Sequence, residues 1–322
     1  MQAILVSRLG GPEQLVPSEL PDREPSAGQV RIRNVRASVN FADLMAVAGN
    51  YPTPGIPFVP GIDTYGVVDA AGEGVDASWL GKHVVAFVDD GGYAEASTAT
   101  SGHFFEVPRD IDADQAGAAP LLLGTCHGLL TRAATLRAGD RVLVHAAAGG
   151  IGSTALQMAR ALGAETVVGV VSGSEKAGLV EELGARPVVA LGAGFSAEAR
   201  RVAGGDFQLI LNAEGGGSVG EDLDVLAPFG TLVVFGMASG EPGVVRSNQL
   251  HPTGRTVAGF SFGLLRRTRP AEVAPLMEPA LAMLADGRIR MVIDSVLPLA
   301  QAAQAHRRLA SRQSKGKILL AP

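Results

Sequence analysis

A glycine-rich segment in the middle of the chain has the spacing needed to hold a phosphate. It follows a predicted buried strand over 141–144 and leads into a predicted helix over 153–162. Its residues are Ala146, Gly149, Gly150, Ile151 and Gly152. Residues without bulk let backbone N–H groups and a helix N-terminus approach a pyrophosphate, whose charge the helix dipole stabilises. Ala146, Gly149 and Gly152 occupy the three spaced positions of a dinucleotide-binding turn, the alternative being an ordinary tight connection.

The residues after the next strand predict which dinucleotide is bound. A site for NADH places Asp or Glu about twenty residues after the glycine turn, where it accepts from ribose hydroxyls. This chain has Ser172 and Gly173 there, and Lys176 follows one helical turn later. Without a carboxylate to repel it, a 2′-phosphate fits beside Lys176. We predict NADPH; the alternative for Lys176 is a solvated helix residue, and Glu175 beside it weakens the positive field.

The elements around this turn predict a doubly wound α/β domain. Short apolar runs alternate with helix-like stretches, and each run is too apolar to have one face in water, which requires a parallel sheet covered by helices on both faces. The runs lie at 141–144, 166–171, 187–191, 207–211, 231–235 and 256–260. We assign this Rossmann dinucleotide-binding domain to residues 113–270.

The first 112 residues have a different pattern. Short alternating or β-branched runs such as Val30–Arg33 and Lys82–Val88 are separated by Gly, Pro and Asp-rich turns. This pattern predicts an irregular, mostly antiparallel β-domain. After residue 270, two predicted helices (274–285 and 300–310) and two predicted strands (near Val292 and at 318–320) are expected to return to it, so the first domain comprises 1–112 and 271–322.

Composition excludes several classes of protein. The chain has 322 residues, of which 47% are hydrophobic and 18% charged, with a net charge of -5. That charge does not attract nucleic acid. A single cysteine, Cys126, allows neither an internal disulfide nor a four-cysteine zinc site. No window approaches the 18 or so unbroken apolar residues of a membrane span. We therefore expect a cytoplasmic protein without nucleic-acid or membrane partners.

Six separated segments have an order and spacing that are typical of one enzyme family. They are Asn40–Asp43, Gly49–Pro52, Pro60–Val68, Leu121–Thr125, His145–Gly152 and Ser311–Leu320. Together they resemble the zinc-independent quinone oxidoreductase branch of the medium-chain dehydrogenase/reductase superfamily, over nearly the whole chain. The resemblance implies a GroES-like β-rich catalytic domain beside the Rossmann domain. It also implies hydride transfer from NADPH to a quinone or a conjugated enone.

The same resemblance argues against a metal. Zinc-dependent relatives carry Gly-His-Glu where this chain has Gly61-Ile62-Asp63, and a cysteine near the position of Asn40. Zinc would act there as a Lewis acid on an alcohol or carbonyl oxygen. We therefore predict no metal and no ordinary alcohol dehydrogenation.

Catalytic roles are also implied by the resemblance. It places Asn40 near the nicotinamide and Tyr51 near the substrate, with Asp43 beside them. The Tyr51 hydroxyl can donate to an oxygen that gains electron density. Alternatively, Asn40 caps a helix through Asp43 and Tyr51 packs a proline-rich loop. Thr125 resembles a threonine that lies against the nicotinamide, with helix capping as its alternative.

The remaining predicted cofactor contacts follow later strands or lie near the C-terminus. They are Asn212, Phe235, Gly236, Met237, Phe260, Phe262 and Arg312. The first four fall where the backbone can contact the nicotinamide end, at the carboxyl ends of strands. Phe260 and Phe262 either line the same pocket or belong to the core, and Arg312 matches a basic residue near the adenine-side phosphate. A family tyrosine is replaced by Leu191, which removes one phosphate hydrogen bond.

Three other polar residues are assigned to packing. Cys126 and His127 are neighbours on one predicted helix, so they cannot face each other as a nucleophile and base. His145, at the end of a buried strand, is predicted to be a core histidine with its hydrogen bonds satisfied.

Two further functions stay open at this stage. An enoyl reductase acting on a conjugated acyl thioester would share the hydride chemistry, and a structural or sensor protein would bind NADPH without catalysis.

The sixth strand of the Rossmann sheet is an edge that must be covered or paired. We expect a homodimer joined there, with apolar surface from Val233–Phe235 and Val244–Val245.

Overall fold

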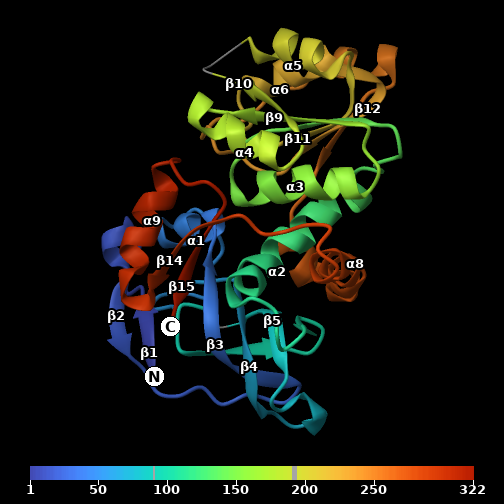
Figure 1. Cartoon of the computed structure of the whole chain (residues 1–322). Helices are drawn as coiled ribbons and strands as arrows, with labels where there is room; N and C mark the ends of the chain where they lie inside the picture. Colours follow the sequence, from blue (N-terminus) through green and yellow to red (C-terminus); the bar gives the residue numbers. More distant parts are fainter. Residues whose placement is uncertain (90, 191–193) are drawn as a thin grey trace. The chain divides into compact units, whose positions relative to one another are not determined.

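The computed structural model describes residues 1–89, 91–190 and 194–322 (Figure 1). Leu191, the predicted departure from the family tyrosine, lies outside the described residues. The chain divides into two compact units. The first comprises Met1–Leu123, Arg269–Ala285 and Met291–Pro322, and the second comprises Gly124–Thr268 and Asp286–Arg290. The domain boundaries at 112 and 270 stay a prediction, and in the structure the first part of helix α2 (Ala113–Gly128) belongs to the first unit.

The second unit is built on a parallel sheet with the order β10-β9-β8-β11-β12-β13. Its strands are β8 (Arg141–Val144), β9 (Thr166–Val171), β10 (Arg186–Val189), β11 (Phe207–Asn212), β12 (Leu226–Val234) and β13 (Thr256–Gly259). From β8 the chain adds strands in one direction, and from β11 it adds them in the other. The carboxyl ends of β8 and β11 therefore mark the topological switch point, where ligands bind in sheets of this kind.

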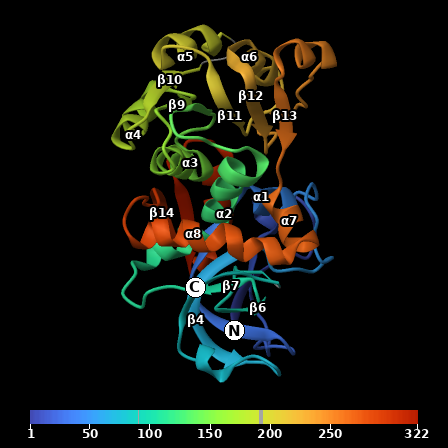
Figure 2. The same cartoon turned by 90° about the vertical axis from the view of Figure 1, so that its right-hand side faces the viewer.

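Helices cover both faces of this sheet, as its apolar strands require. They are α3 (Gly150–Ala161), α4 (Ala177–Glu182), α5 (Phe195–Ala203) and α6 (Ser218–Val225), and α7 (Phe262–Thr268) follows the last strand. Figures 1 and 2 show α3 and α4 on one face and α5 and α6 on the other. The core includes Leu143, Val168 and Ile210 from three adjacent strands, all fully buried. The predicted doubly wound Rossmann architecture is confirmed.

The first unit is a mostly antiparallel sheet, in the order β14-β15-β3-β4-β5-β7 with β6 paired to β3 and a separate β1–β2 ribbon. Its strands are β1 (Gln2–Leu5), β2 (Val16–Glu19), β3 (Gln29–Val39), β4 (Asp63–Ala71), β5 (His83–Phe87), β6 (Ala96–Thr100), β7 (Phe104–Glu106), β14 (Ile293–Pro298) and β15 (Lys317–Ala321). Helices α1 (Phe41–Val47), α8 (Val273–Ala285) and α9 (Ala302–Ala310) complete it.

The C-terminal segment is part of this sheet. Strand β15 pairs antiparallel with β3, with Ile318 opposite Val39, and it pairs in parallel with β14. The tail therefore returns to the first domain, as the sequence predicted. No helix in the described ranges has both the length and the apolar character to cross a membrane.

The edge strand β13 pairs only with β12 among the described strands. The prediction that Val233 contributes to the apolar surface beside this edge was wrong. Val233 is fully buried between its neighbours, because β12 is an interior strand. Val244, by contrast, is 73% exposed, and Phe229, which lies in β12 between the paired residues Leu226 and Thr231, is 85% exposed. These two side chains are available for pairing, and the homodimer stays a prediction.

Candidate functional site

The glycine turn in the second unit has a backbone geometry that excludes side chains. Helix α3 begins at Gly150, directly after Gly149, and the Gly149 N–H donates to the Ala146 carbonyl over 2.9 Å. A Cβ on Gly152 would lie 2.3 Å from the Ala146 oxygen and 2.7 Å from the Ala147 Cα. Both neighbours are backbone atoms that cannot move aside, so the turn requires glycine at position 152.

This geometry leaves donors free for an anion. The first N–H groups of a helix have no partner within it, which applies to Gly150, Ile151 and Gly152 at the start of α3. They lie where the positive end of the helix dipole favours negative charge. Ala146 adopts a φ of 50°, a left-handed conformation that costs a non-glycine residue about 1–2 kcal/mol. The turn fits a pyrophosphate.

Lys176 is held at the end of β9 and is not a solvated helix residue. It is 8% exposed, and its Nζ donates to the Ser172 Oγ over 3.0 Å. The Ser172 side chain is itself exposed, so the ammonium and the hydroxyl together present polar groups at the strand end. The Glu175 carboxylate lies over Gly173, within 2.2 Å of where a Cβ would stand. The site therefore fits a phosphate, with one nearby opposing charge.

Two loops after β11 and β12 are joined by backbone hydrogen bonds. The Phe235 N–H donates to the Asn212 carbonyl over 3.0 Å, and the Ala238 N–H donates to the Ala213 carbonyl over 3.0 Å. Gly236 is required at this contact, because its Cβ would lie 2.6 Å from the Ala213 oxygen. Met237, in the same loop, is half exposed. Four residues predicted to contact the nicotinamide end are thus brought into one paired loop structure.

Three other predicted cofactor residues are placed against or within helix α2. Phe262 is buried, and its ring lies against Gly124, where a Cβ would stand 2.3 Å from the ring. Phe260 packs in the same way on Gly128. These contacts favour the core alternative for both rings. Thr125 is buried inside α2, so it does not cap a helix, and its contact with a nicotinamide stays a prediction.

The polar residues assigned to packing are only partly as predicted. Cys126 and His127 lie on α2, and burial raises the pKa of the Cys126 thiol well above its usual value, so the thiol is no nucleophile. His145 is buried, and its Nε2 lies 2.7 Å from Asp222 Oδ1. Its Nδ1, however, is buried and has no hydrogen-bond partner in the described part of the chain, so the prediction of a satisfied histidine was wrong for that atom.

In the first unit, Asn40 and Asp43 belong to a buried charged network. The Asn40 Nδ2 donates to Asp63 Oδ1 over 2.7 Å, and its Oδ1 accepts from Lys317 Nζ. The Asn40 N–H donates to Asp43 Oδ2 over 2.8 Å, which is half of a capping box at the start of α1. Asp63 also accepts from the Ser38 hydroxyl over 2.5 Å. The network ties β15 to the segment between β3 and α1.

Burial sets the charges of this network. Burial, together with the charge of Asp63, raises the pKa of Asp43 to about 7, although the Asn40 N–H opposes this. Burial also lowers the pKa of Lys317, against the pull of the Asp63 and Asp43 carboxylates. A single buried cation therefore faces two carboxyl groups, one of which takes up a proton near neutral pH.

A tyrosine and a histidine extend the network toward α9. The Tyr93 hydroxyl donates to Asp43 Oδ2 over 3.3 Å and lies 3.0 Å from His306 Nε2. Burial lowers the pKa of His306 to about 4, so the ring is neutral at physiological pH. Because the Tyr93 proton is directed to Asp43, the Tyr93 oxygen is left to accept from His306. Sequence reasoning missed Asp63, Tyr93, His306 and Lys317, although a lysine opening the apolar strand 317–320 was a usable signal.

The other residues predicted in the first unit are closer to solvent. Tyr51 is half-buried against the core, and its hydroxyl has no hydrogen-bond partner among the described residues. Arg312 is exposed and has a φ of 58°. Tyr51 can therefore donate a proton to a ligand, and the proposed roles of both residues stay predictions.

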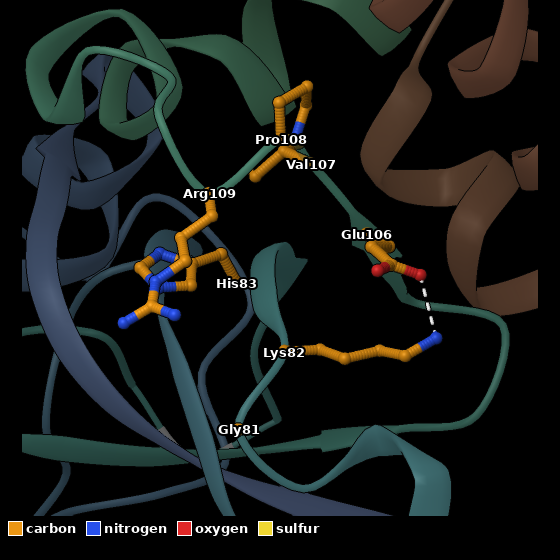
Figure 3. Close-up of a pocket in the computed structure, with 7 residues that line it drawn as sticks. All are labelled: Gly81, Lys82, His83, Glu106, Val107, Pro108 and Arg109. Atoms are coloured by element: carbon orange, nitrogen blue, oxygen red, sulfur yellow. Dashed lines mark hydrogen bonds and ion pairs between the residues drawn. The ribbon is translucent and has the colours of Figure 1, made fainter.

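A surface hollow of about 570 Å³ in the first unit contains none of the predicted residues (Figure 3). Its lining is Gly81, Lys82, His83, Glu106, Val107, Pro108 and Arg109. Lys82 is neutralised by Glu106 over 2.7 Å, and His83 Nδ1 bonds to the Tyr65 hydroxyl over 2.8 Å. Because these groups are already partnered, we assign the hollow no catalytic role.

No three His, Cys, Asp or Glu side chains within the described ranges are grouped so as to hold a metal ion. At the position that aligns with the Glu of the zinc-type triplet, Asp63 is fully buried, and the Leu121 N–H donates to its second oxygen over 3.0 Å. Both carboxylate oxygens are thus occupied by protein donors.

Comparison with known proteins identifies the family. Residues 26–138 match the family described as alcohol dehydrogenase GroES-like domain, and residues 150–279 match that described as zinc-binding dehydrogenase. A quinone oxidoreductase of Pseudomonas aeruginosa is 34% identical, over 97% of this chain and 97% of the relative. The chain belongs to the zinc-independent quinone oxidoreductase branch of the medium-chain dehydrogenase/reductase superfamily.

Two other members of the superfamily cover the whole chain. A 2-haloacrylate reductase of Burkholderia sp is 31% identical over 100% of this chain and 99% of the relative. The structure of a mycobacterial protein complexed with NADPH has a TM-score of 0.91 and 32% identity, and the match covers 100% of both chains. The predicted resemblance is thereby confirmed.

The turn geometry predicts how two matched glycine substitutions affect dinucleotide binding. Gly152→Ala should weaken dinucleotide binding at least about tenfold, because its Cβ cannot fit against the Ala146 carbonyl, and about 1.4 kcal/mol of lost binding suffices for that factor. Gly178→Ala is the control, since a Cβ there meets no atom and alanine favours the helix. Fluorescence titration with NADPH measures both, and equal affinities would show that the turn tolerates a side chain.

The buried network generates a stability prediction. Lys317→Met leaves Asp43 and Asp63 without their cation and should cost about 3–5 kcal/mol of unfolding free energy at pH 8. At pH 6 the loss should be smaller, because Asp43 then takes up a proton. Urea denaturation followed by the fluorescence of Trp79, the only tryptophan, checks this.

Lys315→Met, at a half-buried position two residues earlier, is the control and should cost at most about 1 kcal/mol. Adding Asp43→Asn to Lys317→Met should recover part of the loss, because it removes the uncompensated charge. A loss for Lys317→Met no larger than the control's would contradict the ionic network.

Proposed function

We propose that the protein transfers hydride from NADPH to a quinone or to a conjugated enone, without zinc. This proposal rests mainly on the site at the ends of β8 and β9, where the Gly152 turn fits a pyrophosphate and the Ser172–Lys176 pair fits a 2′-phosphate. Ser172 and Gly173 stand at the end of β9, where a site for NADH has its ribose-binding carboxylate. The mycobacterial relative complexed with NADPH supports this cofactor.

Individual residues of the second unit would hold NADPH. The first N–H groups of α3 would bind the pyrophosphate, Lys176 and Ser172 the 2′-phosphate, and the paired loops after β11 and β12 the nicotinamide end. When bound, NADPH supplies the hydride. The protein then has to position the acceptor, keep out water and place a proton donor beside the oxygen that gains charge.

Tyr51 suits the role of proton donor better than Asn40 or Asp43 does. Its hydroxyl has no partner within the described ranges and the residue is half-buried, whereas the Asn40 amide is already bonded to Asp63 and Lys317. The contacts of Asn40 and Asp43 favour the capping alternative, in which both hold the start of α1 in place. Their direct contact with nicotinamide or substrate stays a prediction.

One matching family is described as zinc-binding, but this chain does not have the ligand residues of the zinc-type relatives. Asn40 and Ile62 stand at positions where zinc-type relatives have Cys and His, and neither offers a suitable zinc ligand. Asp63 already binds Ser38, Asn40 and the Leu121 backbone. We therefore propose a reaction in which acceptor activation comes from conjugation rather than from a metal.

The relatives favour activated acceptors. One carries the name quinone oxidoreductase, and a 2-haloacrylate, the substrate in the name of another, has a carbon–carbon double bond conjugated to a carboxylate. A cytoplasmic location, which we also propose, rests on the single Cys126 of the sequence.

A substrate panel tests this function. Loss of NADPH absorbance is followed with quinones, conjugated enones and conjugated acyl thioesters, each with and without a strong chelator. We expect turnover of a quinone or an enone that the chelator leaves unchanged. Turnover of acyl thioesters alone would identify an enoyl reductase, and NADPH binding without any turnover would identify a structural or sensor protein. Loss of activity with removal of stoichiometric zinc would overturn the metal-free reaction.

Cofactor choice gives a second prediction. NADPH should bind about tenfold to a hundredfold more tightly than NADH, because a charge-assisted contact contributes roughly 1.5–3 kcal/mol. Lys176→Ala should remove most of this preference. Glu175→Gln, which removes a negative charge from the same strand end, should instead strengthen NADPH binding about twofold to fivefold. Fluorescence titration with both cofactors is the measurement; equal affinities in the wild-type protein would refute the phosphate site.

The Tyr51 hydroxyl gives a third. Tyr51→Phe should slow enone reduction about tenfold to a thousandfold, the contribution of one hydrogen bond to a developing oxyanion. Quinone reduction should suffer less, because a quinone needs the proton donor less. Turnover and apparent affinity are measured separately on both acceptors. Unimpaired rates on both would show that Tyr51 only packs its loop.

A further inference from the structure

A buried polar network lies at the topological switch point of the Rossmann sheet. His145 follows β8 and Asn212 ends β11, and both strands end where the direction of strand addition reverses. Asp222, on α6, joins them. Its Oδ1 lies 2.7 Å from His145 Nε2, and its Oδ2 accepts from Asn212 Nδ2 over 2.5 Å. All three side chains are buried, with exposed fractions of 1% or less.

The other end of Asn212 shapes the turn that follows β11. Its Oδ1 accepts from the Glu214 N–H and the Gly215 N–H, each over 2.8 Å, and its Nδ2 also donates to Ser218 Oγ over 2.9 Å. Ser218 in turn donates to the Gly215 carbonyl over 2.7 Å. The turn 212–215 then bonds to the loop after β12 through backbone groups. A continuous chain of contacts thus runs from the glycine turn to the paired loops.

His145 has one buried nitrogen that this network does not use. Its Nδ1 has no hydrogen-bond partner among the described residues and lies 3.8 Å from Glu214 Oε2, beyond hydrogen-bond distance. Glu214 is 43% exposed and can move. The other charged group near the ring is Glu221 on α6, and the Phe195 ring packs edge-on at 5.1 Å from α5. The charged groups found around the histidine are therefore the carboxylates of Asp222, Glu214 and Glu221.

We propose that His145 is a positioning residue of the dinucleotide site, which acts through Asp222 and Asn212 to hold the turn 212–215 ready for the nicotinamide half of NADPH. The inference rests on the function proposed above. Without the His145 contact, Asp222 loses one partner and holds the Asn212 side chain less firmly, so Asn212 binds the two N–H groups of the turn in a smaller fraction of molecules. NADPH then binds only those molecules in which the turn 212–215 is ordered. Its apparent affinity falls in proportion to that fraction.

The charge of His145 makes this positioning pH-dependent. Burial by itself lowers the pKa of His145, but Asp222, Glu214 and Glu221 together raise it above its usual value. A raised pKa means that the ion pair with Asp222 is complete below the unfolded value of about 6.5 and is lost as pH rises through the folded value. NADPH affinity should therefore be highest below about pH 6.5 and should decline as pH rises through the raised pKa of His145.

Two amide variants separate the two nitrogens of the ring. In His145→Gln the amide nitrogen can stand in for Nε2 and donate to Asp222, whereas the shorter side chain of His145→Asn cannot reach it. We expect NADPH affinity within about threefold of wild type for the Gln variant and about tenfold to a hundredfold weaker for the Asn variant. The KM for NADPH should rise with the Asn variant while kcat stays within about threefold, because bound NADPH restores the turn. The Gln variant should also lose the pH dependence.

Ser218→Ala provides a second test that leaves His145 intact, should the Asn variant fail to fold. It removes one acceptor of Asn212 and the bond to Gly215, and it should weaken NADPH binding about twofold to tenfold. Wild-type affinity in the folded Asn variant or in Ser218→Ala, or an equal loss of kcat and affinity in both amide variants, overturns the positioning role. A wild-type protein that binds no NADPH would instead refute the proposed function.

Discussion

The close approach of two backbone segments at Gly152 is the constraint on which the second unit depends. A Cβ at this position would overlap the Ala146 carbonyl, so the strand β8 can turn into helix α3 only where side chains are missing. That turn puts the free N–H groups of the helix at the carboxyl edge of the sheet, beside the switch point between β8 and β11. The end of β9 adds Lys176, held by Ser172, at the same edge. The shape of the dinucleotide site thus follows from one steric requirement and the order of the strands.

The first unit depends on a different interaction, a buried lysine facing two buried carboxyl groups. Taking such charges out of water is costly, and close contacts offset this only when the remaining hydrogen bonds are made. Here Asn40, Ser38 and the Leu121 N–H make them. The arrangement joins the last strand of the chain to the segment that carries α1. It also explains why Asn40 has no free amide group, which leaves Tyr51 as the available donor.

The architecture could be predicted from sequence because its signals are local. The apolar runs gave the strands β8 to β13 to within a few residues, except that β12 begins five residues earlier than the predicted run, and the glycine spacing located the turn. Pairwise polar contacts between distant segments could not be predicted. Nothing near Asp222 or Lys317 in the sequence indicates that one meets His145 and the other Asn40, because those contacts come from chain folding over 77 and 277 residues. The burial of Val233 was missed for a related reason, since strand order decides which apolar residues face solvent.

The central claim is that hydride moves from NADPH to a carbon atom of an activated acceptor. It is tested most directly with NADPH that carries deuterium at both C4 positions of the nicotinamide, a conjugated enone and mass spectrometry of the product. Our account predicts one deuterium at the carbon β to the carbonyl, with the second hydrogen coming from the protein or from water. A reduced product without deuterium at that carbon would contradict it.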